Sequence, residues 1–221
     1  MIKIKNIKKT YGKRTVLDIE NLSFTKGETV AIVGPNGSGK STLLKIIADI
    51  IKSDCGETER KAKLYYLPQQ SFPFRKSVRK NILFSMENNV DKEKRCDEIL
   101  TQLGLTSLAN KNAKGLSGGE AQRLSLGRIL VNDGDFLLLD EPSSAADIEG
   151  TQIIEKAIIN YKNKTGCGVI MTTHSPVQAL KLADRIIMLC DGKIVEDGKP
   201  EELLNNPKTE WGKKFISMWV L

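Results

Sequence analysis

Hydrophobic positions in the N-terminal part of the chain follow the two-residue period that is typical of β-strands. This pattern predicts strands at Ile2–Lys5, Val16–Thr25, Thr29–Val33 and Lys63–Leu67. The fourth strand ends at Pro68, which cannot donate a hydrogen bond to a β-ladder. Between the third and fourth strands, Leu43–Ala48 has the spacing of a helix.

From about residue 75 to residue 133 the pattern changes to a helical period. Helices are predicted at Arg79–Met86, Lys92–Leu103 and Glu120–Asn132. Strands are predicted again at Phe136–Leu139, Gly168–Thr172, Arg185–Leu189 and Ile194–Glu196, and helices at Ile148–Lys162, Pro176–Ala183 and from Pro200 onward. The residues Asp191–Lys193 have the composition of a hairpin turn. Strands that alternate with helices are typical of a mostly parallel sheet covered on both faces, so the pattern predicts an α/β fold with a helical insert.

A length of 221 residues suits one large domain, or one domain with a subdomain. The net charge of +7 is spread along the chain, which favours a solvated basic surface over nucleic-acid binding. A weak attraction to an anionic membrane surface is also compatible with this charge. No apolar run approaches the roughly 18 residues of a membrane helix, and the N-terminal strand pattern lacks a signal-peptide core. We therefore expect a cytoplasmic protein.

The cysteines are far apart in the sequence and form no CxxC pair. They are Cys55, Cys96, Cys167 and Cys190. This spacing favours reduced thiols over a disulfide framework or a zinc site.

A glycine-rich segment, Gly34–Thr42, joins the apolar run Val30–Val33 to the first predicted helix. Strand, glycine-rich turn and helix, with Lys and Ser at the helix start, are the arrangement of a phosphate-binding P-loop. Lys40 is expected to reach the β- and γ-phosphates, and the Ser41 hydroxyl to bind Mg²⁺. The residues expected to surround the phosphates are Gly34, Pro35, Asn36, Gly37, Ser38, Gly39, Lys40, Ser41 and Thr42.

The predicted strand Phe136–Leu139 ends in two adjacent carboxylates, Asp140 and Glu141. Ligands of parallel sheets bind beyond the carboxyl ends of the strands. Because neighbouring residues of a strand point in opposite directions, the two carboxylates should have different roles. Asp140 is the candidate Mg²⁺ holder, through water, and Glu141 is the candidate that orients or deprotonates an attacking water.

Two further features add candidate residues. Ser117 and Glu120 have the spacing of a capping box at a helix start, but a cap does not explain the glycines Gly118 and Gly119 between them. Bare backbone N–H groups at a helix start can also bind a phosphate, and both interpretations can hold at once. His174 is the one histidine of the chain and follows a predicted parallel strand, where its ring could hydrogen-bond to a γ-phosphate.

Taken in order, these motifs resemble those of the ATP-binding cassette (ABC) family. Gly34–Thr42 resembles its Walker A motif, Phe136–Glu141 its Walker B motif, and Leu116–Glu120 the LSGG signature that defines the family. The resemblance implies a P-loop NTPase core with a mostly parallel sheet, an N-terminal antiparallel β-subdomain and an inserted α-helical subdomain. It implies a single ABC ATPase domain over residues 1–221, with a nucleotide-binding core at 1–74 and 134–221 and a helical signature subdomain at about 75–133.

The resemblance also assigns roles in a site for ATP and Mg²⁺. Tyr11 resembles the aromatic residue that stacks on adenine, with Val16 nearby, and Gln69 resembles the glutamine that senses Mg²⁺ and the attacking water. Gln70 follows directly, which leaves that register open by one residue. The catalytic residues implied are Lys40, Gln69, Glu141 and His174, and the metal-binding residues are Ser41, Gln69 and Asp140. In a homodimer, the signature residues Ser117, Gly118, Gly119 and Glu120 of one copy would act on the ATP of the other.

The function implied is ATP hydrolysis that powers solute transport through separate integral membrane permease subunits, on the cytoplasmic face of the membrane. The ending of the chain is similar to that of bacterial import ATPases, which work with an external solute-binding protein, and Pro68–Phe74 loosely resembles cassettes for inorganic anions or polar amino acids. Ser71–Phe84 would receive the membrane subunit, and the apolar tail Trp211–Leu221 is expected to pack as a helix. An exporter ATPase subunit, or a soluble ABC ATPase of iron–sulfur assembly, is the alternative. Ser144–Asp147 resembles the D-loop of the family, with Ala146 where leucine is usual.

Overall fold

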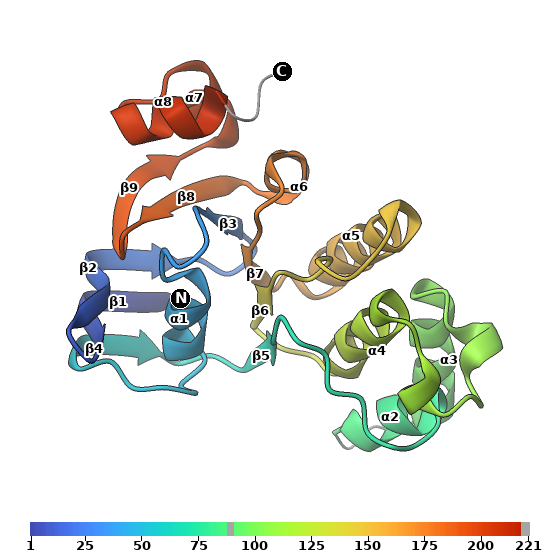
Figure 1. The fold of residues 1–221 in the computed structure, drawn as a ribbon. Coiled ribbons are helices and arrows are strands. Elements are labelled where there is room, and N and C mark those ends of the chain that lie inside the picture. The colour runs from blue at the N-terminus through green and yellow to red at the C-terminus, as the bar shows by residue number, and fades with distance from the viewer. Residues whose placement is uncertain (88–90, 218–221) are drawn as a thin grey trace.

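The computed structural model describes residues 1–87 and 91–217, which form two β-sheets and a surrounding set of helices (Figure 1). The smaller sheet is antiparallel and has the order β2-β1-β4. Its strands are β1 (Ile2–Tyr11), β2 (Arg14–Phe24) and β4 (Cys55–Arg60). The larger sheet has the order β5-β6-β7-β3-β8-β9, and β9 alone among these six pairs in the antiparallel sense. Its strands are β3 (Thr29–Val33), β5 (Leu64–Leu67), β6 (Phe136–Asp140), β7 (Gly168–Thr172), β8 (Arg185–Cys190) and β9 (Lys193–Gly198).

The central strands are buried on both faces, which explains why they read as continuous apolar runs. In β6, Phe136 and Leu138 belong to a core shared with the small sheet and α1 (Lys40–Ile47). Leu137 and Leu139 belong to a second core shared with the helices on the other face. The small sheet and most of the helices therefore lie on opposite sides of the central sheet (Figure 1).

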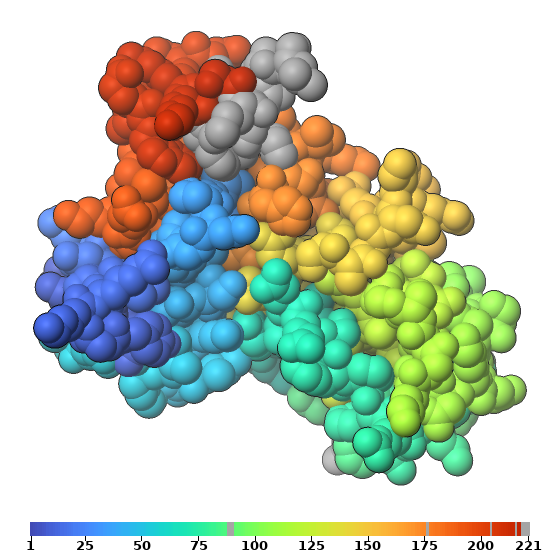
Figure 2. Space-filling model, in the orientation of Figure 1, coloured from blue at the N-terminus to red at the C-terminus, as the bar shows by residue number. Residues whose placement is uncertain are grey.

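The helical part of the chain forms a lobe beside β5 and β6. It contains α2 (Val78–Ser85), α3 (Lys92–Gln102), α4 (Gly118–Leu130) and the short 3₁₀ turns η1 (Thr106–Leu108) and η2 (Ala113–Gly115). Figure 2 shows this lobe standing apart from the antiparallel sheet. The other helices are α5 (Ile148–Thr165), α6 (Pro176–Leu182), α7 (Pro200–Asn205) and α8 (Glu210–Ser217). Within the described ranges, no helix combines the length and the apolar character that crossing a bilayer requires.

The α/β fold, with its mostly parallel sheet and antiparallel N-terminal sheet, is confirmed. The hairpin turn is also confirmed, because Asp191 and Gly192 have φ values of 45° and 77° and join β8 to β9 as a two-residue loop. The exact division into a core and a helical subdomain stays a prediction.

Two strands of the small sheet were predicted wrongly. β1 continues to Tyr11, beyond the predicted end at Lys5, and β4 was not predicted at all. Both misses have one cause: these segments are rich in polar residues, and in the missed part of β1 only Ile7 is buried, so neither shows the apolar alternation of a half-buried strand. In the C-terminal tail the predicted helix is present as α8, and residues 218–221 lie outside the described residues.

Candidate active site

A glycine loop connects the end of β3 to the start of α1 and forms the floor of the site. Gly34 has φ 153°, and a Cβ there would lie 2.0 Å from the carbonyl oxygen of Leu189. Gly39 has φ 107°, and its Cβ would lie 2.6 Å from the carbonyl oxygen of Val16. Both positions need glycine because the backbone turns in the left-handed region and neighbouring backbone lies against it.

Lys40 opens α1 and is buried beneath this loop. Its Nζ donates hydrogen bonds to the carbonyl oxygens of Gly34, at 2.8 Å, and Pro35, at 3.1 Å. Burial lowers the pKa of the Lys40 ammonium, while the neighbouring Glu141 and Asp140 carboxylates act in the opposite direction. One cation and two anions thus meet at the end of the sheet.

Asp140 ends β6 and is held by three hydroxyl groups. Its Oδ1 accepts from Ser41 Oγ at 2.9 Å and from Thr172 Oγ1 at 2.7 Å. The Tyr66 hydroxyl donates to Oδ2 at 3.3 Å, and burial, followed by the Asp140 charge, raises the pKa of Tyr66. The Ser41 hydroxyl and the Asp140 carboxylate are neighbouring hard oxygen donors of the kind that Mg²⁺ prefers.

Glu141 has an unusual backbone for its residue type, with φ 51°. A left-handed conformation is costly for glutamate and persists only where neighbours hold it. The Glu141 N–H donates to Thr172 Oγ1 at 3.0 Å, and Glu141 Oε2 lies 2.7 Å from Nδ1 of the exposed His174 ring. This contact occupies Nδ1, so Nε2 is the nitrogen that could serve a phosphate.

A cavity of about 220 Å³ lies over the glycine loop. It is lined by Val16, Asn36, Gly37, Gly39, Lys40, Ser41, Thr42, Gln69 and Glu141. Gln69 is one of the lining residues and Gln70 is not, which favours Gln69 for the role that the sequence left open. The cavity therefore brings together candidates from the glycine loop, the end of β6 and the segment after β5.

Tyr11 is not one of the residues that line this cavity. It is 53% exposed, and Lys9 Nζ lies 5.5 Å from its ring centroid. Across the β1–β2 hairpin Tyr11 pairs with Arg14, whose Nη2 donates to the carbonyl oxygen of Gly37 at 3.2 Å. Through Arg14, the turn that carries the aromatic ring is attached to the glycine loop.

The Ser117–Glu120 segment is not brought to this cavity. Ser117 and Glu120 form the predicted capping box: Ser117 Oγ accepts from the Glu120 N–H at 3.2 Å, and Glu120 Oε2 accepts from the Ser117 N–H at 2.7 Å. A Cβ on Gly119 would lie 3.3 Å from the Ala145 oxygen and from Ala146 Cα. The close approach of this loop is one reason for glycine, while Ser117 and Gly118 stay exposed at the tip of α4.

Several residues of the site were not assigned a role from the sequence. Arg14, Tyr66 and Thr172 support the candidates described above, and Gln122 contacts the Glu141 backbone at 2.9 Å. Only Thr172 carried a usable signal, because it ends a predicted strand next to the strand that ends at Asp140.

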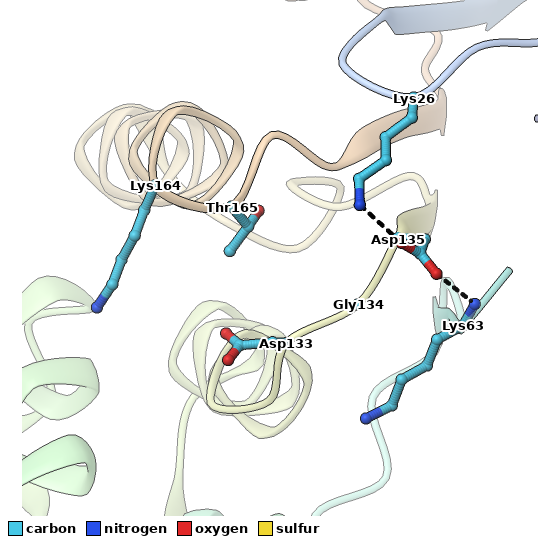
Figure 3. A pocket seen from close by; sticks show the side chains of 7 residues that line it. All are labelled: Lys26, Lys63, Asp133, Gly134, Asp135, Lys164 and Thr165. Carbon is cyan, nitrogen blue, oxygen red and sulfur yellow. Dashed lines mark hydrogen bonds and ion pairs between the residues drawn. The ribbon is translucent and has the colours of Figure 1, made fainter.

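A larger cavity, of about 400 Å³, lies at the opposite end of β6 (Figure 3). Its central carboxylate, Asp135, accepts from Lys26 Nζ at 2.7 Å and from the Lys63 N–H at 2.9 Å. These ionic and hydrogen-bonding groups already satisfy one another, and the cavity is at the wrong end of the parallel strands for a catalytic site. We therefore take the smaller cavity as the candidate active site.

Comparison with known proteins gives a consistent result. Residues 17–144 match the family described as ABC transporter. The chain is 38% identical over 207 residues to the tungstate uptake system ATP-binding protein of Peptoclostridium acidaminophilum, covering 88% of this chain and 97% of the relative. It is 34% identical over 231 residues to a phosphate import ATP-binding protein of Natronomonas pharaonis, covering 91% and 81% respectively. A dimeric ATP-binding cassette bound to ADP and phosphate superposes with a TM-score of 0.83 at 29% identity, covering 90% of this chain and 99% of that one.

Proposed function

The chain belongs to the ABC transporter family and is an ATPase, and from this premise we propose that two copies enclose two ATP molecules to power solute import through separate membrane subunits. One observation carries the proposal: Lys40, the Ser41–Asp140 pair and Glu141 meet beyond the ends of the parallel strands β3 and β6, around one cavity. The relatives cited are named for uptake or import, which favours import over the exporter and iron–sulfur alternatives.

ATP is bound by the glycine loop and the start of α1. The loop N–H groups and Lys40 Nζ hold the β- and γ-phosphates, and the Tyr11 ring stacks on the adenine beside Val16. Ser41 and Asp140 would hold Mg²⁺, together with Gln69, which lines the same cavity. When bound, Mg²⁺ neutralises charge on the phosphate oxygens.

Glu141 orients the attacking water and accepts its proton. His174 Nδ1 holds one carboxylate oxygen, Oε2, at 2.7 Å, which leaves Oε1 for the water. The Lys40 ammonium and the loop N–H groups stabilise the charge that develops on the transferred phosphoryl group.

In the proposed dimer each site takes residues from both chains, which agrees with the Ser117–Gly119 tip of α4 not being among the cavity residues of its own chain. We propose that the tip of a second copy covers the nucleotide, as the dimeric state of the structural relative supports. Two large apolar side chains are exposed at the starts of the helices that follow the site: Ile148 begins α5, and Val177 follows the first residue of α6. We propose that the second copy covers them, which would remove this apolar surface from water.

The membrane subunits are proposed to dock on an aromatic cluster at the start of the helical lobe. Phe72 and Phe84 are exposed, and the Phe74 ring lies edge-on to Phe84, with centroids 5.2 Å apart. The Arg128 guanidinium lies 4.1 Å from the Phe74 centroid and donates to the Phe72 carbonyl oxygen at 2.9 Å, which braces the cluster. Replacing Phe84 with alanine should leave ATPase activity of the isolated chain unchanged and reduce transport; full transport would place the docking site elsewhere.

The solute is set by the membrane subunits and an external binding protein. Two of the relatives are named for tungstate and phosphate, so an inorganic oxyanion is the first solute to test. Uptake of labelled phosphate or tungstate, in cells with and without this chain, would test that assignment.

The central test is Glu141→Gln, with Glu149→Gln, an exposed carboxylate in the first turn of α5, as the matched control. Glu141→Gln should bind ATP, hydrolyse almost none and accumulate as a dimer in light scattering, while Glu149→Gln behaves like the unchanged chain. Lys40→Ala should instead lose ATP affinity. A Glu141→Gln chain that stays monomeric with saturating ATP and Mg²⁺, or that turns over normally, would contradict the proposal.

A further inference from the structure

Gln122 lies in the first turns of α4, directly behind the exposed glycine tip, and is 1% exposed. Its side-chain Nε2 donates to the carbonyl oxygen of Glu141 at 2.9 Å, and its Oε1 accepts from the Ala145 N–H at 2.9 Å. A carbonyl can only accept and an N–H can only donate, so these two partners fix the orientation of the amide. One buried side chain on α4 thus hydrogen-bonds to both ends of the turn that follows β6, at Glu141 and at Ala145.

The first of these contacts falls on the residue whose backbone is strained. Glu141, with φ 51°, is held on one side by Thr172, which accepts from its N–H, and on the other by Gln122, which donates to its carbonyl. The two peptide planes that flank a Cα determine the direction of its side chain. His174 contacts the carboxylate itself, and the Ser144 N–H also reaches the Glu141 carbonyl, at 3.2 Å. From outside this turn, the Glu141 backbone is fixed by one group on the central sheet and one group on α4.

We propose that Gln122 is a positioning residue, which ties the direction of the Glu141 carboxylate to the position of the α4 tip. The inference rests on the function proposed above, in which the tip Ser117–Gly119 of each copy covers the nucleotide of the other. When the tip contacts that nucleotide, the position of α4 sets the position of Gln122. Gln122 in turn sets the position of the Glu141 backbone in its own chain. Binding of nucleotide at one ATP site of the dimer then changes the orientation of the catalytic carboxylate at the other site.

The test is steady-state ATP hydrolysis by the purified chain carrying Gln122→Met, which keeps a similar volume and removes every hydrogen bond of the amide, including a longer one from Nε2 to Ser144 Oγ at 3.4 Å. Misplacing a catalytic group by about 1 Å can cost on the order of 100-fold in rate, so we expect kcat to fall by about 10- to 100-fold. Gln122 does not line the cavity, so KM for ATP should stay within about two-fold of the unchanged value. A second variant, Gln122→Glu, retains an acceptor for the Ala145 N–H and sets an oxygen against the Glu141 carbonyl, and it should lose as much kcat.

Asn132, just beyond the other end of α4, provides the matched control. Its buried amide also bridges backbone groups, donating to the Ser85 oxygen and accepting from the Glu87 N–H, each at 2.8 Å. Asn132→Leu should lower the melting temperature and leave kcat unchanged when all variants are assayed well below their unfolding transitions. Equal kcat losses in Asn132→Leu and Gln122→Met would overturn the inference, because the effect would then be one of stability alone.

The outcomes separate the two proposals. If the unchanged chain hydrolyses ATP, Glu141→Gln abolishes hydrolysis, and both Gln122 variants retain full kcat, the positioning role is wrong and the proposed function stands. If Glu141→Gln hydrolyses ATP normally, the proposed function itself fails.

Discussion

Replacing Thr172 with valine should both destabilise the fold and impair the site. Thr172 ends β7 and is fully buried; its hydroxyl donates to Asp140 Oδ1 at 2.7 Å and accepts from the Glu141 N–H at 3.0 Å. Valine has nearly the same shape, so the substitution opens no cavity. The substitution removes the hydroxyl group, which hydrogen-bonds to both Asp140 and Glu141.

The expected cost follows from these two contacts. A hydrogen bond to a charged group contributes about 1.5–3 kcal/mol, and leaving the buried Glu141 N–H unsatisfied costs about 1–3 kcal/mol. The added methyl group of valine returns about 0.8 kcal/mol by burial. We therefore expect Thr172→Val to lower the free energy of unfolding by about 2–5 kcal/mol, a large part of the roughly 5–15 kcal/mol of a typical domain.

Urea unfolding followed by circular dichroism would measure this change, with Thr172→Ser as the control. Serine keeps the hydroxyl and loses one methyl group, so it should cost only about 1 kcal/mol. ATP hydrolysis should fall with Thr172→Val because Asp140 and Glu141 both lose a support, and should largely survive in Thr172→Ser. If valine costs no more stability than serine, the hydroxyl does not hold these residues and the reasoning is refuted.

Three further predictions concern other parts of the chain. The Lys26 ammonium holds the pKa of Asp135 below its ordinary value. The stability that this carboxylate contributes is therefore present above about pH 4 and is lost as the pH falls through the lower pKa of the folded state. Asp135→Asn should accordingly reduce the loss of unfolding free energy between about pH 4 and lower pH in unfolding experiments. Burial raises the pKa of the Cys96 thiol to about 11, whereas Cys55 is exposed. A thiol reagent at neutral pH should therefore modify Cys55 in the folded protein and Cys96 only after denaturant is added. Modification of Cys96 in the folded protein would contradict its burial. Tyr11→Ala should weaken ATP binding several-fold in a fluorescence titration, from the roughly 0.5–1.5 kcal/mol of stacking, and Tyr11→Phe should bind normally; equal effects would mean that the ring does not stack.

The parts of the site that the sequence predicts are those encoded locally. The glycine loop, Lys40 and Ser41 lie within one short segment, and Asp140 and Glu141 follow directly from the end of an apolar run. A strand followed by a glycine turn and a helix specifies its own geometry, so no distant contact has to be known.

The residues without an assigned role act through contacts between distant segments. Tyr66 and Asp140 are 74 positions apart, and Gln122 and Glu141 are 19 apart, and each pair meets only through the register and packing of different elements. β4 was not predicted for a related reason: it is a polar edge strand, so it has no apolar face that hydrophobic periodicity could detect. Such contacts depend on tertiary structure, which periodicity does not encode.

The supports of the two carboxylates differ in a way that bears on the mechanism. Among the described residues, the side-chain hydrogen bonds of Asp140 come from Ser41 of α1, Thr172 of β7 and Tyr66 of β5, which belong to the central sheet or pack directly on it. Glu141 is held by the sheet and also by α4, through Gln122. A movement of the helical lobe should therefore leave in place the oxygens that we propose bind the metal, and redirect the carboxylate that we propose activates water. By this argument ATP and Mg²⁺ can bind before the lobe is in position, and hydrolysis has to wait for it.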